Sequence, residues 1–311
     1  MTESPVTRST LRPGGPSPLI GHPVVAIPVF IVAFFVLNNF LPRFTFAHGW
    51  PVMVAGPLSA LLAALATFLT IRMVLQGQWV PRDLDPRRVG ALLGGILMGA
   101  VLCGVVFLIL WATGLRTVDG LDPRHPLLVP TFCFGITAGF AEEIAFRGFL
   151  FCGLESLTGT WCATILSGLA FGLLHLTNPG ATLSGALAIG LEAGIGLALL
   201  YRLTGSLWWV VGAHGAWNVV QGPVLGSAIS GATIDGDGIV QSFATGPAWL
   251  SGGDFGLEAS PVSILVWGLL TVWMIQRMRV TGRVVPAPRA LRTLTRRGAT
   301  SPARQPELPL G

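Results

Sequence analysis

Eight long apolar runs occupy most of this 311-residue chain, and they constrain its fold more than any other feature. A membrane-spanning helix needs about 17–25 predominantly apolar residues. The runs that meet this requirement cover approximately residues 24–41, 52–75, 89–113, 127–153, 160–177, 182–203, 206–229 and 260–280. Because backbone polar groups in lipid must be satisfied within the protein, the pattern predicts an all-α membrane protein, a polytopic bundle of about eight transmembrane helices.

The composition supports the membrane class and weighs against nucleic-acid binding. Hydrophobic residues make up 52% of the chain and charged residues 11%, whereas soluble domains carry about 25% charged residues. All 19 cationic side chains are Arg, which gives a formal net charge of +5. Basic segments beside apolar runs are typical of cytoplasmic faces and of contacts with anionic lipid. We therefore expect a lipid bilayer, and no nucleic acid, as the partner of these arginines.

The chain divides into one bundle and two tails. Residues 23–282 are predicted to form the transmembrane bundle. Residues 1–22 are rich in Pro, Ser and Gly, and residues 283–311 are rich in Pro and Arg, so both are predicted to be disordered cytoplasmic tails. No small-residue cleavage site follows the first apolar run, and we expect that run to remain as an anchor.

The placement of Arg predicts the orientation in the membrane. With both termini inside, the outer segments hold only Arg43, Arg116 and Arg124. Apart from Arg147, which lies within the fourth apolar run, the inner segments then hold the other arginines: Arg8, Arg12, Arg72, Arg82, Arg87, Arg88, Arg202 and those from Arg277 to Arg304. The positive-inside rule thus favours N-in/C-in, with the acidic, Gly-rich loop at 230–259 outside as a lid or a connector.

The same composition suggests where the protein resides. A chain that uses Arg in place of Lys and contains 41 Gly is typical of a GC-rich bacterial genome. We expect a multi-pass protein of the bacterial plasma (cytoplasmic) membrane. The sequence assigns no oligomeric state.

The fourth apolar run contains three ionisable residues, Glu142, Glu143 and Arg147. Charged groups at membrane depth cost about 2.5–3.5 kcal/mol each on the insertion scale, so they mark functional sites. Glu143 and Arg147 are four residues apart and face each other on a helix. Glu142 lies about 100° away around the helix. Glu143 with Arg147 is interpreted as structural, and Glu142 as the residue available for acid–base chemistry; the alternative is a fully structural Glu–Arg–Glu network.

Two further apolar runs carry polar residues at helical spacing. Phe171 and His175 are one turn apart, before a turn signal at 178–180. His214 and Asn218 share a helix face and together suit stabilisation of an oxyanion. Taken separately, His175 suits an interfacial helix end, and His214 with Asn218 suits interhelical hydrogen bonding. Three such groups on separate apolar runs favour one convergent site.

Glu192 and the question of a metal remain open alternatives. Glu192 lies in the sixth run without an evident partner in the sequence, and it is a further candidate for the site. Glu142, His175 and His214 form a carboxylate–imidazole set of the type that binds zinc. The chain has no HExxH motif that would place two His ligands on one helix. A metal-free alternative has Glu142 and His175 activating water, with His214 and Asn218 stabilising the oxyanion.

Straight helices would separate these groups in depth. At about 1.5 Å per residue, Glu142 and His175 would lie on the order of 10 Å nearer the outer face than His214. The convergent site therefore requires a tilted or distorted helix. Gly212 and Gly215, which flank His214, make a distortion there plausible on sequence grounds.

At these residues the chain resembles the CAAX-protease and bacteriocin-processing (CPBP, or Abi) family of intramembrane endopeptidases. The family pattern is EExxxR, FxxxH and HxxxN on separate transmembrane helices. The first motif is matched by Glu142, Glu143 and Arg147, and the others by Phe171 with His175 and by His214 with Asn218. The resemblance covers about residues 127–222. The family includes the Ras-converting CAAX endopeptidase of eukaryotes.

The resemblance implies an eight-helix bundle that hydrolyses peptide bonds within the membrane. It implies Glu142 as base, His175 as its assistant, and His214 with Asn218 as oxyanion donors. Glu143 is counted with these catalytic residues, and Arg147 and Phe171 support the site. Members are often labelled metalloproteases, so zinc remains an alternative to a metal-free mechanism. The expected substrate is a membrane-associated protein or peptide, prenylated or not. Alternative functions are a non-catalytic scaffold or bacteriocin-immunity protein of the same fold, and a proton-coupled transporter.

Overall fold

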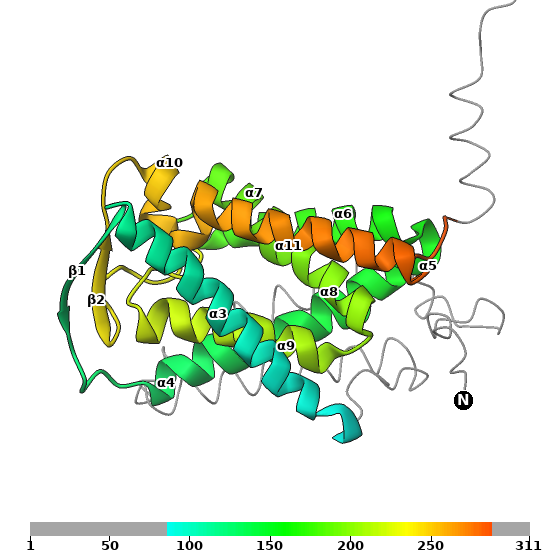
Figure 1. The fold of residues 1–311 in the computed structure, drawn as a ribbon, viewed down its shortest axis with the longest axis horizontal. Helices are drawn as coiled ribbons and strands as arrows, with labels where there is room; N and C mark the ends of the chain where they lie inside the picture. Colours follow the sequence, from blue (N-terminus) through cyan, green and yellow to red (C-terminus); the bar gives the residue numbers. More distant parts are fainter. Residues whose placement is uncertain (1–85, 288–311) are drawn as a thin grey trace, which may run out of the picture.

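A computed structural model describes residues 86–287, and this part of the chain is mostly helical (Figure 1). The predicted tail at 1–22 and the predicted spans at 24–41 and 52–75 lie outside the described residues. The other predicted spans lie within them. The number of spans in the whole chain and its orientation in the membrane remain predictions.

Four helical segments of the described part are long and apolar enough to cross a membrane: Gly90–Ala112, Thr160–Thr177, Leu183–Thr204 and Pro261–Val280. Their ends agree with the predicted spans to within about two residues, as expected where the apolar run alone defines the helix. They comprise α3 (Gly90–Ala112), α6 (Thr160–Leu174) with η6 (His175–Thr177), the continuous series α7 (Leu183–Ile189), η7 (Gly190–Gly196) and α8 (Leu197–Thr204), and α11 (Pro261–Val280).

The first and last of these helices have apolar exposed faces. In α3, Leu93 and Leu97 are 70% and 66% exposed, and in α11, Leu265 and Leu269 are 63% and 65% exposed. Water-soluble proteins rarely expose continuous apolar faces of this kind. The faces of α3 and α11 therefore fit contact with lipid.

The helix that carries the two glutamates is wider than an α-helix. It comprises α4 (Leu128–Pro130), η4 (Thr131–Glu142), η5 (Ile144–Phe151) and α5 (Cys152–Thr158), and η4 and η5 are π-helical. π-Helical turns are rare and are often found at functional sites. The helix of the glutamates is therefore distorted from regular α-helical geometry.

The predicted distortion at Gly212 and Gly215 is wrong, because α9 (Leu207–Val219) is α-helical through both residues. Their role is close packing. A Cβ atom on Gly212 would lie 2.4 Å from the carbonyl oxygen of Leu92 in α3, and one on Gly215 would lie 2.6 Å from that of Gly135 in η4. Small residues let membrane helices approach this closely, so α9 is held between α3 and η4. It continues into η8 (Val220–Val224).

A two-stranded antiparallel sheet, absent from the all-α prediction, lies at one end of the molecule, at the left of Figure 1. It pairs β1 (Arg116–Leu121) with β2 (Val240–Ala244). Short helices follow β2: α10 (Ala248–Ser251), η9 (Gly253–Phe255) and η10 (Leu257–Ala259). The sheet joins the connection after α3 to the predicted outer loop, which places those two segments at the same end.

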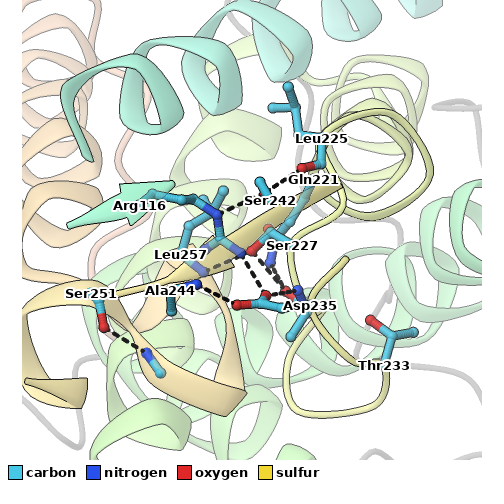
Figure 2. Close-up of polar contacts among 12 residues, drawn as sticks. Arg116, Gln221, Leu225, Ser227, Thr233, Asp235, Ser242, Ala244, Ser251 and Leu257 are labelled. Atoms are coloured by element: carbon cyan, nitrogen blue, oxygen red, sulfur yellow. Dashed lines mark hydrogen bonds and ion pairs between the residues drawn. The ribbon is translucent and has the colours of Figure 1, made fainter. Parts of the chain in front are cut away.

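A partly buried ion pair attaches this loop to β1 (Figure 2). Arg116 is 1% exposed, and its Nη2 donates to Asp235 Oδ1 at 2.5 Å, while its Nε donates to the hydroxyl of Ser242 at 3.0 Å. The carboxylate of Asp235 also accepts hydrogen bonds from the backbone N–H groups of Ala228 and Ala244. The half-buried carboxylate of Asp235 thus organises the loop between η8 and β2.

The opposite end is closed by η3 (Pro86–Arg88) and by the residues after α11. Arg88 Nη1 donates to the carbonyl oxygen of Gly205 at 2.8 Å, and Arg283 donates to that of Leu203. Val285 accepts a hydrogen bond from the backbone N–H of Thr160. Residues 283–287, assigned to the disordered tail in the prediction, therefore pack on the bundle.

Candidate active site

Glu143 is the centre of the polar network, and one of its oxygens serves two partners. Glu143 Oε1 lies 2.7 Å from Arg147 Nη1 and 2.7 Å from His214 Nδ1. The three residues are almost fully buried, at 0%, 1% and 6% exposure. The predicted pairing of Glu143 with Arg147 at i, i+4 is therefore present, and it also holds the imidazole of the third motif.

Arg147 connects the helix of the glutamates to η7. Its Nη2 donates to the backbone carbonyl oxygens of Ala193 and Gly194. Its guanidinium carbon lies 4.6 Å from the ring centroid of Phe171, a cation–π contact. A planar guanidinium with several donors is suited to such a multiple role, which a Lys side chain would not reproduce.

Phe171 brings the second motif into the same cluster. Its ring centroid lies 4.9 Å from that of His175 and 5.8 Å from that of His214. Phe146, from the helix of the glutamates, packs edge-on against the same ring at 5.0 Å. The structure therefore brings residues of all three motifs together around one buried aromatic ring.

Glu142 is positioned differently from its neighbour. It is half-buried, whereas Glu143 is 0% exposed. Within residues 86–287 it makes no hydrogen bond or ion pair, while Glu143 makes two. This arrangement agrees with the division of roles expected from the helical spacing, in which Glu143 is held in the network and Glu142 remains available.

His175 lies at the end of α6, where the chain changes to the 3₁₀ turn η6. Its Nδ1 lies 2.9 Å from the carbonyl oxygen of Phe171, one turn earlier. The turn that follows is fixed to the outer loop, because Asn178 Nδ2 donates to the carbonyl oxygen of Ser230 at 2.7 Å. The described residues show His175 beside Phe171, with no hydrogen bond to Glu142.

A small cavity adjoins the third motif. His214 and Asn218 line it, together with two carboxyl residues, Glu192 of η7 and Glu258 of η10. The space available to the centre of a water molecule is about 20 Å³. A cavity needs about 10–15 Å³ on this measure to hold one water molecule, so it admits a water and no peptide.

Glu192 and Glu258 extend the polar set that the motifs identify. Glu192 is 2% exposed and accepts a hydrogen bond from the Ser263 hydroxyl at 2.7 Å. Glu258 is 3% exposed and accepts one from Ser230. Burial raises the pKa of Glu258 above its ordinary value, although hydrogen bonds to the carboxylate oppose the shift. Both hydrogen bonds join residues far apart in the chain.

Only one of these two carboxyl residues could be identified as a site candidate from the sequence. Glu192 was identifiable as an acid inside an apolar run. Glu258 belongs to a segment that the apolar pattern assigns to an exposed loop, and nothing local indicated that this segment is buried.

The residues suggested as zinc ligands do not form a metal-binding group in this part of the fold. Between residues 86 and 287, no three His, Cys, Asp or Glu side chains are arranged to hold a metal ion. His175 and His214 each have Nδ1 engaged with an oxygen acceptor. In this arrangement Glu142, His175 and His214 do not converge on one point where an ion could bind.

The comparisons with known proteins agree with the motifs. A protein-family model described as "Type II CAAX prenyl endopeptidase Rce1-like" matches residues 124–220, the segment that contains all three motifs. No curated protein and no solved structure matches the chain. Over this segment the chain is therefore similar to the Rce1-like CAAX prenyl endopeptidases, and the resemblance indicated by its motifs is confirmed.

Proposed function

We propose that the protein is an intramembrane endopeptidase whose base is Glu142. The observation that carries this proposal is the contrast between two adjacent carboxylates. Glu143 is engaged by Arg147 and His214, whereas Glu142 is half-buried and makes no hydrogen bond or ion pair to any residue between 86 and 287. A carboxylate beside a rigid, preorganised network suits proton transfer.

In the proposed mechanism Glu142, assisted by His175, takes a proton from a water molecule. The water oxygen attacks the carbonyl carbon of the substrate peptide and forms a tetrahedral intermediate. His214 and Asn218 donate hydrogen bonds to its oxyanion. Collapse breaks the C–N bond, and Glu142 returns the proton to the leaving amine.

Glu143 acts through His214 in this scheme. Because Glu143 Oε1 accepts from Nδ1–H of the imidazole, the other ring nitrogen, Nε2, is left to face the substrate, and it donates to the oxyanion when the ring carries a proton on both nitrogens. Arg147 and Phe171 fix the network from two sides. These residues are positioning groups in the proposal.

The proposed substrate is a membrane-anchored protein or peptide, prenylated or not. The lipid-facing character of α3 and α11 supports a site reached from the bilayer. We propose the bacterial plasma membrane as its location, on the basis of the Arg-only, Gly-rich composition.

The test compares the wild type with Glu142→Gln in detergent, on a library of membrane-tethered peptides. We expect Glu142→Gln to lower kcat at least about 100-fold, because general acid–base groups contribute about 10²–10⁴-fold. Glu155→Gln is the control, since Glu155 is also buried but pairs with Arg202 outside the site. Equal cleavage by wild type and Glu142→Gln would overturn the assignment of the base.

A chelator arm decides the metal question. Cleavage that survives phenanthroline supports the metal-free scheme, whereas loss that zinc restores would make Glu142, His175 and His214 metal ligands. No cleavage of any peptide by folded wild type would favour the scaffold or immunity function.

A further inference from the structure

The small cavity beside His214 and Asn218 has polar groups on several sides within an apolar enclosure. Glu192 and Glu258 contribute carboxyl groups, and His214 and Asn218 contribute an imidazole and an amide. The remaining walls are apolar or aromatic: Ile189, Ala193, Leu197, Ala213, Trp217 and Trp267. A space with this lining differs from a packing defect, which would be apolar throughout.

Its size and hydrogen-bonding capacity fit one water molecule. The space open to a water centre is about 20 Å³, above the minimum of roughly 10–15 Å³, and a buried water needs two to four polar partners. Glu192 is 2% exposed, and its Oε1 has no hydrogen-bond partner among the described residues. Buried polar atoms left without a partner are uncommon, and ordered water is an ordinary way to satisfy them.

We propose that this cavity is a binding site for a single ordered water molecule, held by Glu192, Glu258 and Asn218 and bordered by the His214 ring. Where the chain acts as the proposed endopeptidase, Glu192 and Glu258 are then positioning residues of its active site. They hold the side chain of Asn218 through the water and touch no reacting atom.

The two carboxyls anchor the water to different parts of the fold. Glu192 is fixed by the Ser263 hydroxyl near the start of α11. Glu258 is fixed by Ser230, whose carbonyl oxygen also accepts from Asn178 in the turn after His175. The outer loop, the turn after His175 and the His214 helix are thereby connected at one buried point.

Radiolytic labelling tests the water directly and requires no substrate. X-ray radiolysis of a bound water generates a hydroxyl radical that oxidises the nearest side chain. Trp217 and Trp267 line the cavity and are 6% and 4% exposed, and their rings are tilted by 54° with centroids 5.7 Å apart. The full chain in detergent would be irradiated in heavy-oxygen water, and oxidation of these rings would be measured by mass spectrometry.

The variants are Glu192→Met, which removes the carboxyl and adds apolar volume, and Glu192→Gln, which keeps the shape and one oxygen. We expect oxidation of Trp217 and Trp267 in wild type and Glu192→Gln, and its loss in Glu192→Met. Glu155→Gln, a buried carboxyl outside the cavity, is expected to behave as wild type. Absence of labelling in wild type, or equal labelling in wild type and folded Glu192→Met, would overturn the water site.

The activity arm tests the positioning role. We expect Glu192→Met to lower kcat about tenfold with KM nearly unchanged, since one ordinary hydrogen bond is worth a factor of that order. Partial rescue in Glu192→Gln would support positioning through hydrogen bonding. Unchanged kcat in Glu192→Met despite lost labelling would overturn the positioning role alone.

A different result would show that the proposed function has failed: in the wild type, Trp217 and Trp267 are oxidised on irradiation, but the protein cleaves no peptide. That result would leave the water site standing and remove its catalytic context.

Discussion

At the scale of residues, the site depends on one carboxylate oxygen that serves two donors. Glu143 Oε1 accepts from Arg147 and from His214, while Glu143 Oε2 has no partner within the described residues. The Arg147 half of this arrangement could be predicted from the i, i+4 spacing. The His214 half joins residues 71 apart, and no local pattern specifies which oxygen an imidazole from another helix will contact.

The first residue-scale prediction concerns Arg147. Arg147→Leu removes the cation while Glu143 stays buried, and breaking a buried pair in this way costs about 3–5 kcal/mol. We expect the free energy of unfolding, measured by denaturing-detergent titration in mixed micelles, to fall by that amount. The double variant Glu143→Leu/Arg147→Leu should lose less than Arg147→Leu alone, because no uncompensated charge remains. A free energy of unfolding for Arg147→Leu equal to that of the wild type would contradict a stabilising role for the Glu143–Arg147 pair.

The second residue-scale prediction concerns Glu258 and pH. Burial raises its pKa in the folded state, against the opposing influence of Ser230, Gln221 and nearby His175. The folded state therefore binds more protons than the unfolded chain above the unfolded pKa of about 4.3. Its contribution to stability is largest below that pKa and falls as pH rises toward the raised folded value.

Glu258→Gln removes this titration. We expect the pH profile of stability, wild type minus Glu258→Gln, to slope downward from about pH 4 toward neutrality. Unfolding midpoints in a denaturing-detergent series at several pH values would measure it. A difference that is flat, or that rises with pH, would mean that Glu258 ionises in the fold as readily as in water.

At the scale of elements, apolar run length predicted where the helices lie, and it did not predict what kind of helix each one is. α3 begins and ends within one residue of the predicted span. The π-helical geometry of η4 and η5 has no signature in the apolar pattern, and η4 packs closely against α9 at Gly135 and Gly215. The sheet of β1 and β2 joins segments more than 100 residues apart, each too short to carry a strand signal of its own.

The element-scale prediction concerns the attachment of the outer loop (Figure 2). Asp235→Ala leaves Arg116 buried without its partner and removes the acceptor for the N–H groups of Ala228 and Ala244. Hydrogen bonds to charged groups are worth about 1.5–3 kcal/mol. We expect amide hydrogen exchange across residues 226–245 to accelerate at least about tenfold, with exchange in α6 unchanged.

Asp254→Asn is the control for this experiment, because Asp254 is exposed in the same loop region. We expect its exchange pattern to match wild type. Acceleration in both variants would show that any loss of acidic charge loosens the loop, and no change in Asp235→Ala would show that the sheet alone holds it.

At the scale of the whole molecule, the two ends differ in charge as the positive-inside rule requires of a membrane protein. One end carries the sheet and the acidic loop, and the other carries Arg88, Arg283 and their contacts to the turn after α8. Within residues 86–287, the connections after α3 and η6 and the loop at 230–259, which the sequence assigned to one side of the membrane, meet at one end of the fold. The fold has no marker for which end faces the cytoplasm, so that assignment depends on Arg placement alone.

The whole-molecule prediction is therefore the orientation. Ile234 is 75% exposed in the acidic loop, and Ser301 lies in the basic C-terminal sequence. In a background whose four cysteines are replaced by Ala, Ile234→Cys should react with an impermeant maleimide on intact cells, and Ser301→Cys only after permeabilisation. The reverse pattern would put the loop and the sheet in the cytoplasm. The loop at 230–259 would then face cytoplasmic rather than external substrates. Most of the Arg side chains would lie outside, against the transmembrane potential and the anionic lipid that favour cations on the cytoplasmic side.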